Sequence, residues 1–120
     1  MRLCLTAHRA GFIPLWMDTL TRLERIIAER RNAPATDSYV AQLHARGMPV
    51  IARKVGEEAV EAAIASLAGS REELVGEAAD LLFHLMVLLS AKEVALDEVM
   101  AELDRREGVS GLAEKAARTA

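Results

Sequence analysis

Apolar residues recur every three or four positions along most of the chain, which is the spacing of one face of an α-helix. The first helix is expected to follow Asp18, whose side chain can cap the first turn, and to run to about Arg31. Its apolar face is made by Leu20, Leu23, Ile26 and Ile27. A second, short helix over residues 38–46 is expected to end at Gly47, because glycine suits a helix C-cap.

Two longer helices follow, with a short break between them. Pro49 falls in the first turn of the third helix, which is predicted over residues 48–67. The stretch from Ser70 to Glu73 matches a capping box, so the fourth helix is predicted to begin there and to continue to about residue 91. The two helices meet across the short break at Gly69 and Ser70.

The fourth helix is apolar on almost every side between residues 81 and 89, and such a helix must be buried all round. Four or five short helices in one chain can hardly enclose it, so we expect a dimer in which this helix meets its counterpart. A fifth helix is predicted over residues 96–106, followed by Gly108 as its end. Its inward residues are expected to be Val99, Met100 and Leu103.

The composition supports one all-α domain. Among the 120 residues there are only one Trp, one Tyr and two Phe, so the core must be built from Leu, Ala, Val, Ile and Met. We expect a four- to five-helix bundle over residues 17–108. Residues 1–16 show no clear period and are expected to lie outside the fold, with Met17 as an alternative start. Residues 109–120 are expected to form a flexible or weakly helical tail.

Charge and cysteine content exclude several classes of function. The net charge of −3 leaves no basic surface that would indicate binding to nucleic acid or to a membrane. Cys4 is the single cysteine, which rules out an intrachain disulfide and a cysteine-based zinc site. No secretory signal is evident, and the apolar run at 81–89 is too short to span a bilayer. A cytoplasmic protein is the simplest interpretation.

Acidic residues are placed in two pairs on the neighbouring third and fourth helices. Glu58 and Glu61 form one pair, Glu77 and Asp80 form the other, and each pair is one turn long and set among Ala and Leu. Glu57 adds a fifth carboxylate beside the first pair. On antiparallel helices the pairs can face each other, and oxygen ligands of this kind suit Mg²⁺ or Mn²⁺. Ordinary surface charge is the competing interpretation.

Several residues near the acids have two interpretations each. Lys54 lies one turn before Glu58 and either forms a helical ion pair or binds a substrate phosphate. His84 is either a hydrogen-bonded residue behind the ligands or a ligand itself. Ser38 and Tyr39 can touch a ligand, but a helix cap and a packed aromatic residue are equally consistent with the sequence.

Two segments, KVGEEAVEAAIAS and EAADLLFHLMVLL, resemble the phosphoribosyl-ATP pyrophosphohydrolase family. The flanking segments DSYVAQLHARG and DEVMAELDRREGVSGLAEKA resemble it too, so the likeness covers about residues 18–117. The acidic core of the motif is shared with the wider group of all-α, MazG-like nucleotide pyrophosphohydrolases. The Lys-Val-Gly-Glu-Glu and Ser-Tyr segments are specific to the narrower family.

The resemblance implies an intertwined homodimer that hydrolyses phosphoribosyl-ATP to phosphoribosyl-AMP and pyrophosphate, in the second step of histidine biosynthesis. It implies Mg²⁺ as the cofactor, with Mn²⁺ as a substitute. The implied metal ligands are Glu58, Glu61, Glu77 and Asp80. Glu57 would be an additional ligand or the general base, which makes Glu57 and Glu58 the catalytic candidates. Lys54 and Arg53 would meet the phosphates, and Ser38 and Tyr39 would line the substrate site.

One position departs from the family, because Val50 stands where members often carry a basic residue. Two rival functions stay open. One is a related enzyme that clears non-standard nucleoside triphosphates. The other, of a different class, is a helical dimer that binds partners without catalysis. The chain has neither the length nor the cysteines expected for a fusion with the zinc-dependent enzyme of the next step, so the stand-alone form is expected.

Overall fold

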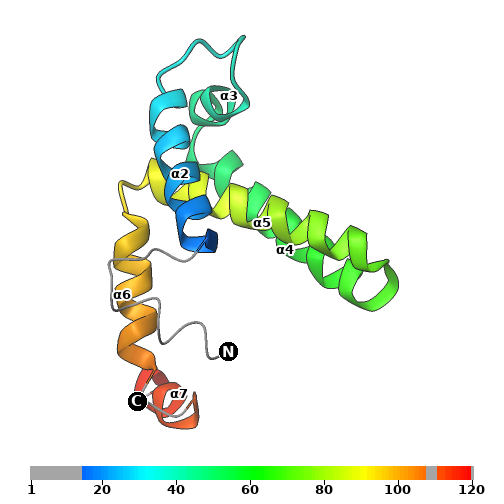
Figure 1. Ribbon diagram of the computed structural model, residues 1–120, viewed down its shortest axis with the longest axis vertical. Coiled ribbons are helices and arrows are strands. Elements are labelled where there is room, and N and C mark those ends of the chain that lie inside the picture. Colours follow the sequence, from blue (N-terminus) through cyan, green and yellow to red (C-terminus); the bar gives the residue numbers. More distant parts are fainter. Residues whose placement is uncertain (1–14, 108–110, 120) are drawn as a thin grey trace.

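The computed structural model describes residues 15–107 and 111–119, apart from the side chains of residues 15–18, 113 and 114. The described part contains helices and no strand, which confirms the all-α prediction (Figure 1). The helices are α2 (Leu15–Arg30), α3 (Tyr39–Arg46), α4 (Met48–Ala68), α5 (Arg71–Ala91), α6 (Leu96–Arg106) and α7 (Gly111–Thr119).

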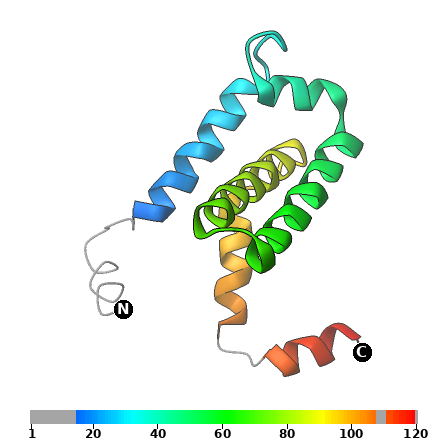
Figure 2. The same cartoon turned by 90° about the vertical axis from the view of Figure 1, so that its right-hand side faces the viewer.

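The helices α2, α3 and α4 form an arch around α5, whereas α6 and α7 extend away from it (Figure 2). α4 and α5 run antiparallel and pack along their length, and the end of this hairpin projects beyond α2 and α3 (Figure 1). The antiparallel arrangement on which the facing of the two acidic pairs depended is therefore present. It brings residues of the third and fourth predicted helices face to face.

Local signals in the sequence set the ends of these helices. Ser70 caps α5, and its hydroxyl oxygen accepts a hydrogen bond from the Glu73 backbone N–H at 3.1 Å. Gly47 ends α3 and directly precedes α4, with a φ of 95° that few residues other than glycine adopt. Pro49 lies in the first turn of α4, where its missing N–H costs nothing.

The core lies at the base of the hairpin, where α2 and α3 cover α4 and α5. Its buried aliphatic members are Ile27, Val40, Leu43, Ile51, Met86, Val87 and Leu96. Each fully buried side chain of this size contributes about 1.5–3 kcal/mol relative to an exposed one, as an upper estimate. Towards the turn of the hairpin the cover ends, and Leu67 is 89% exposed.

The structure corrects three expectations about the first and the fifth of the predicted helices, which are α2 and α6. α2 begins at Leu15, so Asp18 lies inside the helix and does not cap it; the preceding Leu, Trp and Met residues continue the helix because none of them breaks it. Ile26 is 44% exposed, because it points about 100° away from Ile27, which meets the core. Leu103 is also exposed, since α6 has left the arch at that point.

The ends of the chain were predicted only in part. The tail contains a regular helix, α7, whose described side chains are all exposed. The expected extension over residues 1–16 overlaps α2 at its last two positions, and residues 1–14 lie outside the described residues. The expected helix end at Gly108 lies outside them as well.

Candidate metal centre

Three carboxylates converge between α4 and α5. Glu58 comes from α4, whereas Glu77 and Asp80 come from α5, and one oxygen of each lies within 4.8 Å of the others. Two helices meet here because their small and aliphatic faces pack together, and the antiparallel direction places the acidic turns at the same height. Hard divalent cations prefer such a set of oxygen ligands.

Burial of these carboxylates raises the free energy of the folded protein unless positive charge compensates them. Glu58 is only 6% exposed. Within the described residues, the buried Oε2 atoms of Glu58 and Glu77 have no hydrogen-bond partner. A buried carboxylate oxygen that has lost water without gaining a partner costs free energy, and adjacent carboxylates repel each other. A divalent cation would supply the missing interactions, so these residues fit the expected Mg²⁺.

Two acids of the predicted site lie outside the converging group. Glu61 is exposed and lines a groove of about 250 Å³ that Glu77 also lines. Glu57 lies on the outer side of α4, because consecutive helical residues point about 100° apart and Glu58 faces α5. Its carboxylate lies 3.5 Å from Arg53 and 3.3 Å from Lys54. The structure thus brings together three of the four expected ligands.

Lys54 connects the outer and inner carboxylates of α4. Its Nζ lies 3.3 Å from Glu57 and 3.5 Å from Glu58. The hydrogen bond to Glu57 raises the pKa of Lys54, electrostatic interactions with Tyr39, Glu57 and Glu58 raise it further, and partial burial opposes them. Lys54 therefore carries a positive charge at neutral pH. The helical ion pair expected one turn along, with Glu58, is present, and the pair with Glu57 was not predicted.

His84 is buried between Asp80 and Tyr39. Its Nδ1 lies 2.8 Å from the Asp80 backbone carbonyl, which can only accept, so Nδ1 carries a hydrogen. In the neutral ring Nε2 is then an acceptor, and the Tyr39 hydroxyl donates to it at 3.0 Å. His84 is not one of the converging metal-ligand candidates. This geometry agrees with a residue behind the ligands.

Tyr39 is the first residue of α3, and its position depends on the cap that precedes it. Ser38 is buried, and its hydroxyl oxygen accepts from the Ala41 N–H at 3.3 Å. The Tyr39 ring stacks on Phe83, with centroids 6.1 Å apart, and remains 45% exposed. Both rings meet His84 edge-on. Phe83 was not among the predicted site residues, although its place beside His84 in the sequence was a usable signal.

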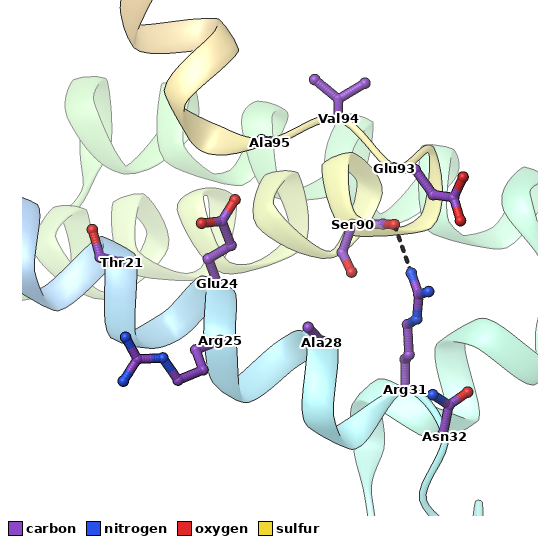
Figure 3. A pocket seen from close by; sticks show the side chains of 10 residues that line it. All are labelled: Thr21, Glu24, Arg25, Ala28, Arg31, Asn32, Ser90, Glu93, Val94 and Ala95. Atoms are coloured by element: carbon purple, nitrogen blue, oxygen red, sulfur yellow. Dashed lines mark hydrogen bonds between the residues drawn. The ribbon is translucent and has the colours of Figure 1, made fainter.

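A larger cavity, of about 640 Å³, lies away from the acids, between α2 and the connection from α5 to α6 (Figure 3). Two of its polar side chains are already used to close helix ends. Arg31 donates to the Ser90 carbonyl at 3.1 Å, and Glu24 accepts from the Leu96 N–H at 2.7 Å. The cavity is therefore a structural joint, and the acid cluster is the candidate site.

Fold and site together define an all-α protein with a carboxylate centre suited to a divalent cation. The model of the family "Phosphoribosyl-ATP pyrophosphohydrolase" matches residues 20–107, which include every converging acid. The chain belongs to this family. The resemblance noted from its motifs is thereby confirmed.

Relatives of high identity carry the corresponding name, phosphoribosyl-ATP pyrophosphatase. The chain is 67% identical over 102 residues to a protein of Erythrobacter litoralis, covering 85% of this chain and 98% of that one. It is 65% identical over 102 residues to a protein of Novosphingobium aromaticivorans, with 85% and 95% covered. A protein of Rhodobacter capsulatus is 54% identical over 102 residues, with 85% and 99% covered.

Proposed function

We propose that this chain hydrolyses phosphoribosyl-ATP to phosphoribosyl-AMP and pyrophosphate, as a step of histidine biosynthesis. The observation that carries the proposal is the family match over residues 20–107, together with relatives that bear the same name at 54–67% identity. Family membership makes the chain an enzyme that acts on a phosphoanhydride. The reaction consumes water and cleaves the bond between the α- and β-phosphates.

We assign the cation site to Glu58, Glu77 and Asp80, with Glu61, one turn along α4 from Glu58, as a further ligand. The burial of Glu58 and the partnerless oxygens support this assignment. Mg²⁺ is the proposed ion and Mn²⁺ its substitute, because all the side chains are carboxylates. When bound, such an ion neutralises polyphosphate charge and favours attack by water.

The remaining residues have proposed roles in binding and proton transfer. Arg53 and Lys54 would attract the phosphates, since both cations contact Glu57 and Lys54 also contacts Glu58 of the cluster. Glu57 is accessible and would accept the proton of the attacking water, whereas the buried Glu58 would serve the cation. The exposed face of Tyr39 would contact the substrate, and Ser38 would act by fixing the first turn of α3.

We further propose that the protein is a homodimer. Seven large apolar side chains on the α4–α5 hairpin are exposed in the single chain: Val60, Ile64, Leu67, Leu74, Val75, Leu82 and Leu85. Gly56 and Gly76 face open space, since a Cβ atom added at either would meet, among the described residues, nothing within 4 Å beyond the backbone of its own helix. A second hairpin lying against these faces would bury the apolar residues and use the close approach that glycine allows.

The helix α5 also meets the length and hydropathy criteria for a membrane span, which differs from the expectation drawn from the apolar run at 81–89. Core helices of soluble proteins meet the same criteria. Because α5 carries Glu77 and Asp80 in the middle of its length, we propose a cytoplasmic dimer in which a second copy covers its apolar side chains. The test is to purify the protein without detergent and to measure its mass by light scattering after gel filtration. The mass of a dimer is expected.

The activity is tested by incubating the purified protein and Mg²⁺ with phosphoribosyl-ATP and, separately, with a panel of nucleoside triphosphates. Release of pyrophosphate with a clear preference for phosphoribosyl-ATP is expected. A preference for the panel would favour the enzyme that clears non-standard nucleotides. No turnover of any substrate by folded protein would favour the non-catalytic helical dimer.

A further inference from the structure

The hydrogen bond between Tyr39 and His84 links the two parts of the chain that carry the candidate metal ligands, α3–α4 and α5. Glu58 lies on α4, which is joined to α3 through Gly47 alone, and Tyr39 is the first residue of α3. His84 lies on α5, one turn after Asp80. The Tyr39 hydroxyl reaches His84 Nε2 at 3.0 Å and so ties the α3–α4 unit to the turn of α5 that bears Asp80.

Each member of this connection is held in place by a second contact. His84 Nδ1 is bonded to the Asp80 carbonyl at 2.8 Å, which fixes the plane of the ring and leaves Nε2 as the acceptor. The Tyr39 ring stacks on Phe83, and the Ser38 cap sets the direction of its backbone. Tyr39 is also close enough to Lys54 to raise the pKa of its amino group, and Lys54 contacts Glu58.

We propose that Tyr39 and His84 are positioning residues, whose hydrogen bond holds Asp80 in register with Glu58 across the hairpin. The proposal rests on the proposed metal-dependent function. Carboxylates that share one cation must be placed to within a fraction of an ångström, so a contact that sets the distance between two helices controls the affinity for the ion. The ring face of Tyr39 stays open for substrate, and the positioning role belongs to its hydroxyl group.

The test is the affinity of the substrate-free protein for Mn²⁺, measured by the electron paramagnetic resonance of the free ion. Tyr39→Phe keeps the ring and removes the donor. His84→Asn keeps a group at the position of Nδ1 but cannot reach Tyr39. We expect each variant to bind Mn²⁺ about tenfold more weakly, the lower end of the effect of residues that orient metal ligands. His84→Gln places an acceptor near the position of Nε2, so it should recover part of the loss.

His44→Asn is the matched control. His44 makes the same local contact as His84, from Nδ1 to the Val40 carbonyl at 2.9 Å, but its Nε2 has no partner within the described residues. This variant should bind Mn²⁺ like the unmodified protein. Melting temperatures recorded without metal exclude unfolding as the cause of any loss in the other variants.

A double variant, Tyr39→Phe with His84→Asn, gives the sharpest result. Because both changes remove the same hydrogen bond, the double variant should bind Mn²⁺ no more weakly than the worse single one.

Three results would overturn the proposal, and the first two differ from the third in what else they remove. Unchanged Mn²⁺ affinity in Tyr39→Phe, or additive losses in the double variant, would remove the positioning role while leaving the proposed activity intact. If the unmodified protein neither bound Mn²⁺ nor released pyrophosphate, the proposed function would fail, and the positioning role would fail with it.

Discussion

The two ends of the α4–α5 hairpin are built from similar residues but have different surroundings. At the base, Ile51 is 2% exposed and Val87 is fully buried, because α2 and α3 cover them. Near the turn, Ile64 is 58% and Leu67 is 89% exposed. The acid cluster lies between these regions. The apolar pattern of a helix therefore tells how much surface must be covered but not which chain covers it.

The largest effect is expected from Ile51→Ala at the base. Removing most of a fully buried side chain should lower the free energy of unfolding by about 2–5 kcal/mol, because the surrounding core cannot close the cavity. The loss should not depend on protein concentration. Urea unfolding at two concentrations measures it, and a loss below about 1 kcal/mol would contradict a core at this end.

Glu58→Gln probes the boundary between the two regions. Turnover of phosphoribosyl-ATP should fall by at least about 100-fold, since loss of a ligand should exceed the loss caused by residues that only orient ligands. Melting without metal should change little, because relief of the repulsion among the converging carboxylates offsets the loss of the ion pair with Lys54. Mg²⁺ should raise the melting temperature of the unmodified protein but not that of the variant.

The matched control for this variant is Glu72→Gln. Glu72 is exposed in the first turn of α5 and lies outside the converging acids. It should keep full activity and the full response to Mg²⁺. Equal losses in both variants would indicate a general effect of charge and would count against a defined metal centre.

Ile64→Ala repeats the Ile51 change near the turn of the same helix. In an isolated chain this exposed residue would contribute little, within about 0.5 kcal/mol. In the proposed dimer its loss should make melting depend more steeply on concentration and shift the dimer–monomer equilibrium towards monomer. Sedimentation velocity over a dilution series measures the shift. No change in either property would contradict an interface at this position.

A smaller effect is expected at the joint beneath α6. The residue before this helix is Ala95, which has no side-chain acceptor, and the Glu24 carboxylate from α2 bonds the Leu96 N–H instead. Glu24→Ala should cost about 1 kcal/mol, the typical value of a lost N-cap. Thermal melting measures the loss, with Glu29→Ala, an exposed residue of the same helix, as the control.

The smallest effect concerns Glu102 on α6. Hydrogen bonds from Arg105, and then from Arg106, lower the pKa of its carboxyl from 4.5 to about 2. A carboxyl whose pKa is depressed on folding adds stability above pH 4.5, and this contribution is lost as the pH falls towards 2. A pH titration of the Glu102 carboxyl carbon by NMR should give a midpoint near pH 2. A midpoint near pH 4.5 would show that the ion pairs do not persist in solution.

Features specified by neighbouring residues could be predicted from the sequence. The Ser70 cap, the Gly47 end and the start of α4 all depend on groups within four positions of one another, and the structure confirms them. The periodicity also placed two acidic pairs, Glu58 with Glu61 and Glu77 with Asp80, on neighbouring helices. These predictions needed only the helical repeat and the direction of one turn.

Features that depend on tertiary contacts could not be predicted in the same way. The carboxylate that caps α6 comes from Glu24, which is 72 positions from Leu96 in the chain. The partner of His84 comes from another helix, and nothing around Tyr39 in the sequence indicates it. Glu57 and Glu61 were grouped with Glu58 by spacing, but only the packing of α4 on α5 decides which of them faces inward.

The single residue between α3 and α4 also limits how this protein can vary in length. The connection over residues 32–37 is an exposed loop in which an insertion need only bulge outward. An insertion beside Gly47 would instead turn one helix by about 100° and advance it by about 1.5 Å relative to the other. Tyr39 would then point away from His84. We therefore expect family members to differ in length in the loop at residues 32–37 and to keep the single-residue connection at Gly47 unchanged.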